Sequence, residues 1–105
     1  MQIITVDYEN EKGETIEQLP INFADILSIL YKKEMSDKKY PWIMTIDPYG
    51  DTTFNPLQWP HLISEFNQLQ AELEDKNAKN ILVNLIAFLK KNQEQTHTYI
   101  KFIGD

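Results

Sequence analysis

The chain has 105 residues and no cysteine, which excludes thiol catalysis, thiolate metal sites and disulfide bridges. Its formal net charge is -6, from 16 acidic and 10 basic residues, and every basic residue is lysine. Because it lacks arginine and its acidic surface repels phosphate groups, the chain is not expected to bind nucleic acid. The same charge suits a basic protein partner.

Length and hydropathy also bear on domain organisation and location. A chain of this size buries about two thirds of the surface that its unfolded form exposes, so residues 1–105 are expected to form one domain without a metal or disulfide staple. The first stretch, MQIITVDYEN, has no basic region, and no segment has the long apolar run that crosses a membrane. These features predict a soluble cytoplasmic protein with no membrane partner.

The N-terminal third predicts two strands and a helix. Apolar and polar residues alternate over residues 2–8, which predicts a strand, and residues 14–18 are expected to return as a weak second strand. The acidic side chains of this hairpin are interpreted as solvated groups that discourage edge pairing, with a docking patch for a cationic partner as the alternative. Asn22 is a good N-cap, and the apolar spacing after it predicts a helix over residues 22–33.

The middle of the chain is expected to form a hairpin. Residues 42–46 are apolar on both alternating faces, which predicts a central strand. In the following IDPYGDTTFN, the residues Asp47, Pro48 and Gly50 have the order of a type I turn. Gly50 is expected to take the left-handed conformation that closes a bulged hairpin, and the chain then returns through residues 52–54.

Two antiparallel helices are expected next. The segment from Asn55 to Gln58 has a capping-box pattern, but Pro60 limits it to one short turn at residues 56–59 before the main helix. Apolar residues then recur at helical spacing: Leu62, Phe66, Leu69 and Leu73. This stripe stops near residues 76–80, and we place the join there, because one uninterrupted helix would be about 50 Å long.

The last third completes the predicted fold. The segment NILVNLIAFLKK, residues 80–91, is apolar almost all round and is expected to be the most buried helix. Residues 98–102 alternate again and predict a final strand. The resulting order is β(β)αββααβ. The expected fold class is α+β, with an antiparallel sheet of about four strands and three helices packed on one face.

Few residues offer catalytic or metal chemistry. The two histidines, His61 and His97, lack the spacing of a zinc site, so we expect no metal and no cofactor. Asp47 and Asp51 are the best carboxylate pair, because a closed turn brings them together, where they share a proton or attract a cation. The stronger interpretation is structural, with each aspartate accepting a hydrogen bond from a nearby donor, Asp47 in an Asx-turn.

Four aromatic residues surround the same turn in the sequence. Trp42 and Phe54 are expected to fill a corner of the core. Tyr49 is at the third position of the turn and is expected to project outward between acidic residues, as interface anchors do. Trp59 and His61, at the start of the adjacent helix, are expected to extend this binding surface.

Two stretches resemble a known group of proteins. IDPYGDTTFNPLQWPHLISE, residues 46–65, and YIKFIGD, residues 99–105, are similar to small bacterial proteins of uncharacterised function that carry I/V-D-P-Y-G-D-T-x-F-N-x-L-Q and a closing K-F-x-G-D. The resemblance implies no established activity. In broad character, a small acidic domain of this kind is also similar to the immunity proteins that neutralise toxins of competing bacteria.

The sequence therefore favours a protein-binding module over an enzyme, with a toxin-neutralising immunity protein as its specific form. The candidate binding residues are Asp47, Tyr49, Asp51, Trp59 and His61. Two alternatives stay open. One is a small cation-dependent hydrolase that uses Asp47, Asp51 and His61, and the other is a homodimeric structural protein that pairs through an edge strand or the Trp59 surface.

Overall fold

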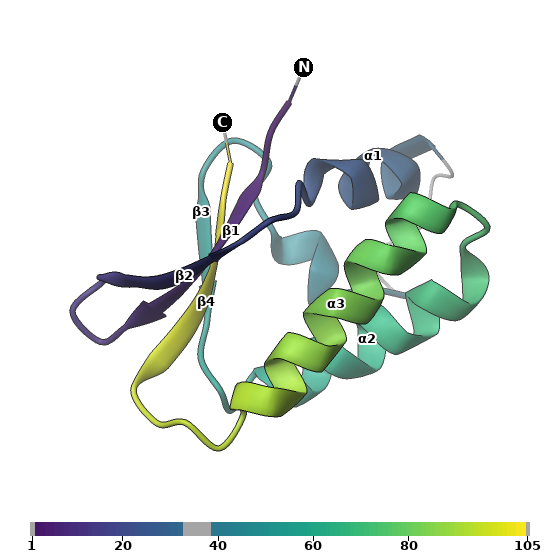
Figure 1. Ribbon diagram of the computed structural model, residues 1–105. Helices are drawn as coiled ribbons and strands as arrows, with labels where there is room; N and C mark the ends of the chain where they lie inside the picture. Colours follow the sequence, from purple (N-terminus) through teal and green to yellow (C-terminus); the bar gives the residue numbers. More distant parts are fainter. Residues whose placement is uncertain (1, 33–38, 105) are drawn as a thin grey trace.

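The computed structural model describes residues 2–32 and 39–104. A β-sheet forms one layer and the helices form the other (Figure 1). The elements in chain order are β1 (Thr5–Asn10), β2 (Thr15–Leu19), α1 (Ala24–Lys32), the 3-10 helix η1 (Ile43–Thr45), β3 (Asp51–Phe54), α2 (Trp59–Glu72), α3 (Lys76–Asn92) and β4 (Thr98–Ile103).

The sheet places the first and last strands of the chain side by side at its centre. The strand order is β2-β1-β4-β3, and every neighbouring pair is antiparallel. Val6 of β1 lies opposite Phe102 of β4, and Phe54 of β3 lies opposite Ile100 of β4. The two ends of the chain consequently leave the sheet at the same end (Figure 1).

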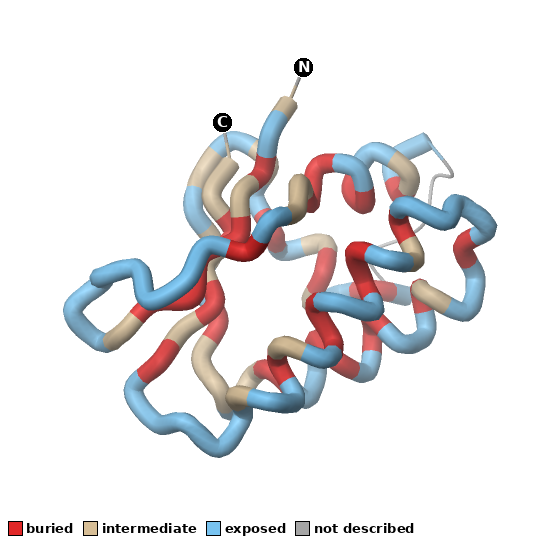
Figure 2. The backbone as a smooth tube through the Cα atoms, in the orientation of Figure 1, coloured by how far each residue is buried: buried red, intermediate tan, exposed pale blue. Residues whose placement is uncertain are grey.

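The core lies between the sheet and the helices. Side chains alternate between the two faces of a strand, so β4 buries Ile100 and Phe102 on the helix side. The Phe102 ring packs edge-on against Phe23, which directly precedes α1, with 4.9 Å between ring centroids. Buried residues concentrate where the two layers meet (Figure 2). The predicted class is confirmed: an α+β fold with an antiparallel four-stranded sheet and three helices on one face.

The N-terminal elements match their predictions with small shifts. The first strand occupies Thr5–Asn10 instead of 2–8, because its ladder with β4 extends to Asn10. The turn after it contains Gly13, whose φ of 80° suits glycine. The Asn22 side chain accepts hydrogen bonds from the N–H groups of Ala24 and Ile4, at 3.0 and 2.9 Å, so it caps α1 and ties that helix to the first strand. Residue 33, the last of the predicted helix, lies outside the described residues.

The predicted strand at residues 42–46 is wrong. The chain forms η1 there, because the carboxylate of Glu65 on α2 accepts hydrogen bonds from the N–H groups of Trp42 and Ile43, at 3.1 and 3.0 Å. An alternating strand pattern cannot reveal a carboxylate that lies more than twenty positions further along the chain. The predicted hairpin is also wrong, because β3 pairs with β4 and not with the preceding segment.

The turn that precedes α2 confirms the capping-box prediction. The Asn55 N–H donates to Oε1 of Gln58 at 2.8 Å, and the Gln58 N–H donates to Oδ1 of Asn55 at 3.1 Å. The helix itself begins at Trp59, one residue before the predicted start, with Pro60 in its first turn. Proline is tolerated there because an N–H in the first turn has no partner within the helix.

The helix join and the burial of α3 differ from the predictions. The join lies at residues 73–75 instead of 76–80, because Asp75 is the N-cap and accepts from the Ala78 N–H at 2.9 Å. From that cap α3 runs back alongside α2 (Figure 1). It is amphipathic and not buried all round: Val83 is 44% exposed, and Asn84 lies on the surface beside it.

Candidate binding surface

The Asp47–Gly50 turn is held together by the side chain of its first residue. Oδ1 of Asp47 accepts a hydrogen bond from the Tyr49 N–H at 2.8 Å, and the Gly50 N–H donates to the Asp47 carbonyl oxygen at 3.4 Å. The predicted Asx-turn is therefore confirmed. Gly50 is not among the residues with positive φ, so the predicted left-handed conformation is wrong. The turn leads into a strand that pairs elsewhere, and it has no hairpin to close.

The same turn packs against the end of β4. The Gly104 N–H donates to the Gly50 carbonyl oxygen at 2.7 Å, and a Cβ atom added at Gly104 would lie only 2.5 Å from the Pro48 carbonyl oxygen. The Gln2 side-chain amide also donates to that oxygen. The two stretches on which the sequence resemblance rests, residues 46–65 and 99–105, thus meet at this point.

Two of the predicted binding residues, Tyr49 and Asp51, reach solvent here. The Tyr49 side chain projects from the turn and the residue is 77% exposed. Asp51 begins β3, and its Oδ2 lies 3.4 Å from Nζ of Lys101. The prediction that Asp51 serves a local donor is wrong, because its carboxylate pairs with a lysine that is distant in the sequence, on the neighbouring strand β4. Tyr49 and Asp51 are both accessible to a partner.

Trp59 and His61 do not join this group. The predicted exposure of Trp59 is wrong, since the residue is fully buried and its indole N–H donates to the Phe54 carbonyl oxygen at 3.0 Å. His61 is exposed and stacks on the Trp42 ring, with centroids 4.7 Å apart. Both follow the end of β3, whereas Tyr49 precedes its start, so the strand separates the two pairs (Figure 1).

The hydrolase alternative needs Asp47, Asp51 and His61 to converge. Instead Asp47 binds a backbone N–H of its turn, Asp51 pairs with Lys101 and His61 stacks on Trp42. Across residues 2–32 and 39–104, no group of three or more histidine, aspartate or glutamate side chains is arranged to hold a metal ion. The structure therefore does not bring together the three side chains that the hydrolase alternative needs.

The sheet face turned away from the helices carries a second set of polar side chains beside Asp51, some exposed and some buried. Because alternate residues of a strand share a face, the register places these together. We call them the outer face: Asp7 and Glu9 of β1, Tyr99 and Lys101 of β4, and Asp51 and Thr53 of β3. Tyr49 lies next to the Asp51 end of this face.

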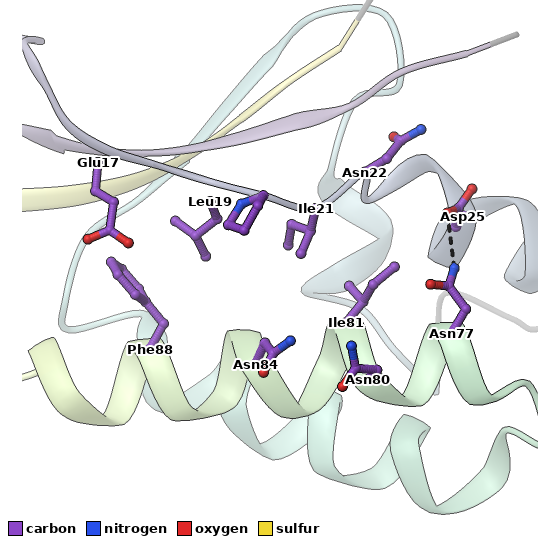
Figure 3. A pocket seen from close by; sticks show the side chains of 11 residues that line it. Glu17, Leu19, Ile21, Asn22, Asp25, Asn77, Asn80, Ile81, Asn84 and Phe88 are labelled. Carbon is purple, nitrogen blue, oxygen red and sulfur yellow. Dashed lines mark hydrogen bonds between the residues drawn. The ribbon is translucent and has the colours of Figure 1, made fainter.

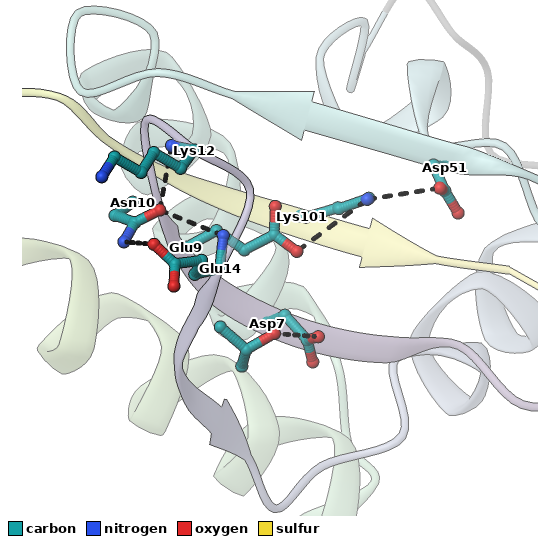
Figure 4. Close-up of polar contacts among 8 residues, drawn as sticks. Asp7, Glu9, Asn10, Lys12, Glu14, Asp51 and Lys101 are labelled. Carbon is teal, nitrogen blue, oxygen red and sulfur yellow. Dashed lines mark hydrogen bonds and ion pairs between the residues drawn. The ribbon is translucent and has the colours of Figure 1, made fainter.

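One lysine pairs with two of the three carboxylates on the outer face. Nζ of Lys101 lies 3.4 Å from Asp51 and 3.8 Å from Glu9 (Figure 4). Asp7 is only 8% exposed, and its Oδ2 accepts from the Thr15 hydroxyl at 3.3 Å. Its Oδ1 is buried and has no hydrogen-bond partner within the described residues. A carboxylate oxygen buried without a partner is costly, so this face is under-compensated for its negative charge.

Asp7, Glu9 and Lys101 are not among the candidate binding residues predicted from the sequence. The first two belong to the acidic N-terminal hairpin, whose side chains are interpreted there as solvated groups with a docking patch as the alternative, although both residues are over 90% buried. A signal was present, because Asp7 and Glu9 alternate with Val6 and Tyr8 and must share one face of the strand. Only the pairing of β1 with β4 shows that a single lysine lies between them and Asp51.

No protein family, curated protein or solved structure matches this chain. The resemblance noted in the sequence therefore stays a prediction, and the function has to be argued from the site itself. Among the described residues, no helix has the length and apolar character needed to span a membrane.

Proposed function

We propose that this protein is a binding module for a basic protein partner, which docks on the outer face and on Tyr49 beside it. The observation that carries the proposal is the charge imbalance on the outer face, where Lys101 is the one cationic side chain of the described residues set among Asp7, Glu9 and Asp51. A cationic side chain from a partner compensates that imbalance, and the net charge of -6 attracts such a partner over a longer range.

Tyr49 supplies the aromatic contact of the proposed interface. Aromatic residues with a polar tip are enriched among the few positions that carry most of the binding energy, because they bury a large area at a low entropic cost. A tyrosine that is 77% exposed, on a turn fixed by Asp47 and Gly104, is already held in place before the partner arrives. Charge then steers the encounter, and Tyr49 slows dissociation.

The specific form of the proposal is an immunity protein that neutralises a bacterial toxin. It rests on the small size and acidic charge of the chain. In this form of the proposal, the partner is a toxin encoded by an adjacent gene, which we call the neighbour protein. Expression of that neighbour alone is expected to stop growth, and co-expression of this chain is expected to restore it. Normal growth with the neighbour alone, or no rescue by this chain, contradicts the immunity form.

The binding surface is tested by calorimetry with the purified neighbour protein. Glu9→Gln combined with Asp51→Asn is expected to weaken binding at least tenfold at low salt, and Tyr49→Ala about thirtyfold, as a central aromatic anchor does. Salt is expected to weaken wild-type binding more than binding of the charge variant. Glu74→Gln, at the exposed α2–α3 join, is the matched control and is expected to bind as wild type. Equal binding by all variants overturns the proposed surface.

A further inference from the structure

A groove separates β2 from the helices on the side opposite the outer face. It has a volume of about 450 Å³ and runs between the strand and the exposed side of α3 (Figure 3). Neither the Tyr49 turn nor any residue of the outer face lines it. The groove is therefore a separate surface, and the proposed function does not use it.

One wall of the groove is the free edge of the sheet. β2 is an edge strand and pairs with β1 on one side. On its other side, the backbone N–H and C=O groups of every second residue have no neighbouring strand within the described chain. The usable stretch is short. Ile16 has no partner in the β1 register, which marks a bulge, and Pro20 follows the strand directly. Glu17 and Leu19, between these limits, both line the groove.

The opposite wall carries side-chain amides. Asn77, Asn80 and Asn84 are spaced three and four residues apart, which places them on one side of α3. All three are exposed and line the groove. Asn77 donates to the Asp25 carboxylate at 3.2 Å. A side-chain amide has the same donor and acceptor groups as a peptide bond, so Asn80 and Asn84 complement the backbone of a chain lying between α3 and β2.

Charge and hydropathy define what fits between these walls. Glu17 lies near Phe88 at one end of the groove and Asp25 lies near Asn77 at the other (Figure 3). No lysine lines it within the described residues. The middle is apolar, with Leu19 of β2 and Ile21 just after it on one side and Ile81 of α3 on the other. The matching occupant has an apolar side chain flanked on the same side by two cationic ones.

We propose that this groove binds an extended segment of a partner protein, which adds to β2 as a fifth strand and directs a basic–apolar–basic set of alternate side chains between β2 and α3. Strand addition satisfies the unpaired edge through main-chain hydrogen bonds, and the groove selects the alternate side chains. The inference rests on the proposed function only in taking the partner to be basic, and it places a second contact away from the outer face.

The test uses a defined peptide, Thr-Lys-Thr-Leu-Thr-Lys-Thr, capped at both ends and titrated into isotopically labelled protein. Its two lysines and its leucine lie on one side of an extended chain, as the groove requires. The expected result is saturable shifts of the backbone amides of residues 15–19 and of the side-chain amides of Asn80 and Asn84. A scrambled peptide with adjacent lysines is expected to bind about tenfold more weakly.

Matched variants decide whether the groove is the site. Glu17→Lys, and separately Asn80→Ala with Asn84→Ala, are each expected to weaken peptide binding about tenfold. Their controls are Glu74→Lys and Asn67→Ala, which make comparable changes at exposed positions outside the groove. The folds of all variants are checked by their amide spectra. Equal losses in the controls, or shifts confined to the outer face, overturn the inference.

The failure of this inference is separable from that of the proposed function. Glu9→Gln with Asp51→Asn is expected to leave peptide binding unchanged while weakening the calorimetric titration with the toxin. No peptide binding together with intact toxin binding overturns the groove alone. Light scattering tests whether a second copy of the chain occupies the groove instead. If the wild type is a dimer and Glu17→Lys dissociates it, a second copy covers β2, and this result also overturns the inference.

Discussion

The position of the candidate surface is fixed by single residues that are not part of it. Gly104 lets the end of β4 approach the Pro48 backbone, and Glu65 holds the backbone of η1 from a helix that follows it in the sequence. Neither residue belongs to the outer face. Both belong to the frame that positions Tyr49 and Asp51, so their substitution affects stability first.

Gly104 is predicted to tolerate no side chain. A Cβ atom there would lie 2.5 Å from the carbonyl carbon and oxygen of Pro48, so Gly104→Ala must displace the turn and is expected to lower the free energy of unfolding by about 1–3 kcal/mol. Urea denaturation followed by tryptophan fluorescence measures this. Gly13 is the contrast, because nothing lies near its Cβ position and only its positive φ matters. Gly13→Asn is expected to cost little, whereas Gly104→Asn is expected to be as harmful as Gly104→Ala.

Glu65 is predicted to stabilise the fold through its carboxylate. Glu65→Ala leaves the Trp42 and Ile43 N–H groups without their acceptor, which is expected to cost about 2–3 kcal/mol of unfolding free energy. Glu65→Gln keeps one acceptor oxygen and is expected to cost less. Glu74→Ala, on the exposed join, provides the control and is expected to stay within about 0.5 kcal/mol of wild type. A Glu65→Ala variant as stable as that control refutes this role.

Secondary-structure elements are joined by polar contacts as well as by the core. The last turn of α2 is tied to the segment before η1, where Nζ of Lys39 lies 2.7 Å from Oε2 of Glu72 and the buried Tyr40 hydroxyl donates to Oε1. These hydrogen bonds, that of Lys39 first, lower the pKa of Glu72 below its ordinary value of 4.5. Burial of its hydroxyl, with the Glu72 carboxylate next to it, raises the pKa of Tyr40.

The lowered pKa of Glu72 predicts a contribution to stability that acid removes. A carboxylate whose pKa is lower in the folded state stabilises the fold above its ordinary pKa, and this contribution disappears as the pH falls through the folded value. Glu72→Gln is therefore expected to be less stable than wild type at about pH 7, with the difference shrinking towards about pH 3. Urea denaturation across this range, with Glu74→Gln as the reference, measures it. A difference that does not change with pH contradicts the linkage.

A sequence pattern predicts a structural feature when the residues that cause the feature are neighbours in the chain. The capping box at Asn55 and Gln58 and the Asx-turn at Asp47 involve neighbours in the chain, and both were predictable. The conformation of residues 42–46 was not, because it depends on Glu65. One hint was available, since Glu65 follows Leu62 by three residues and so falls on the buried side of α2. The outer face likewise needs the β1–β4 register. Trp59 is predicted to lie on the surface because it starts the helix next to the turn, and the sequence does not show that its indole N–H donates to the Phe54 carbonyl oxygen inside the core.

The molecule as a whole is organised around the pair of central strands. β1 and β4 lie next to each other in the sheet although almost the whole chain separates them, and β4 is also the only strand that pairs with β3 in the described structure. The outer face is consequently assembled from both ends of the sequence and from β3 in its middle. Its charge balance, with Lys101 on β4 and Asp7 and Glu9 on β1, exists only in the complete fold.

Removal of β4 is predicted to abolish cooperative folding. A chain ending at Gln95 loses the buried Ile100 and Phe102 and leaves β3 without a strand to pair with. Its amide NMR spectrum is expected to be poorly dispersed, and its urea denaturation is expected to show no cooperative transition. A synthetic peptide of residues 96–104 added in trans is expected to restore the dispersed spectrum, and the same peptide with Phe102→Ala is expected to restore less. A truncated chain that unfolds cooperatively without the peptide contradicts this prediction.

The central place of β4 also has a consequence for synthesis of the protein in a cell. The helices and the β1–β2 pair can form as they leave the ribosome, but β1 and β3 lack the strand that lies between them until β4 has emerged. Until then the sheet is incomplete, and the nascent chain exposes core residues to chaperones and proteases. Products of translation interrupted before β4 are therefore expected to stay unfolded and to be degraded.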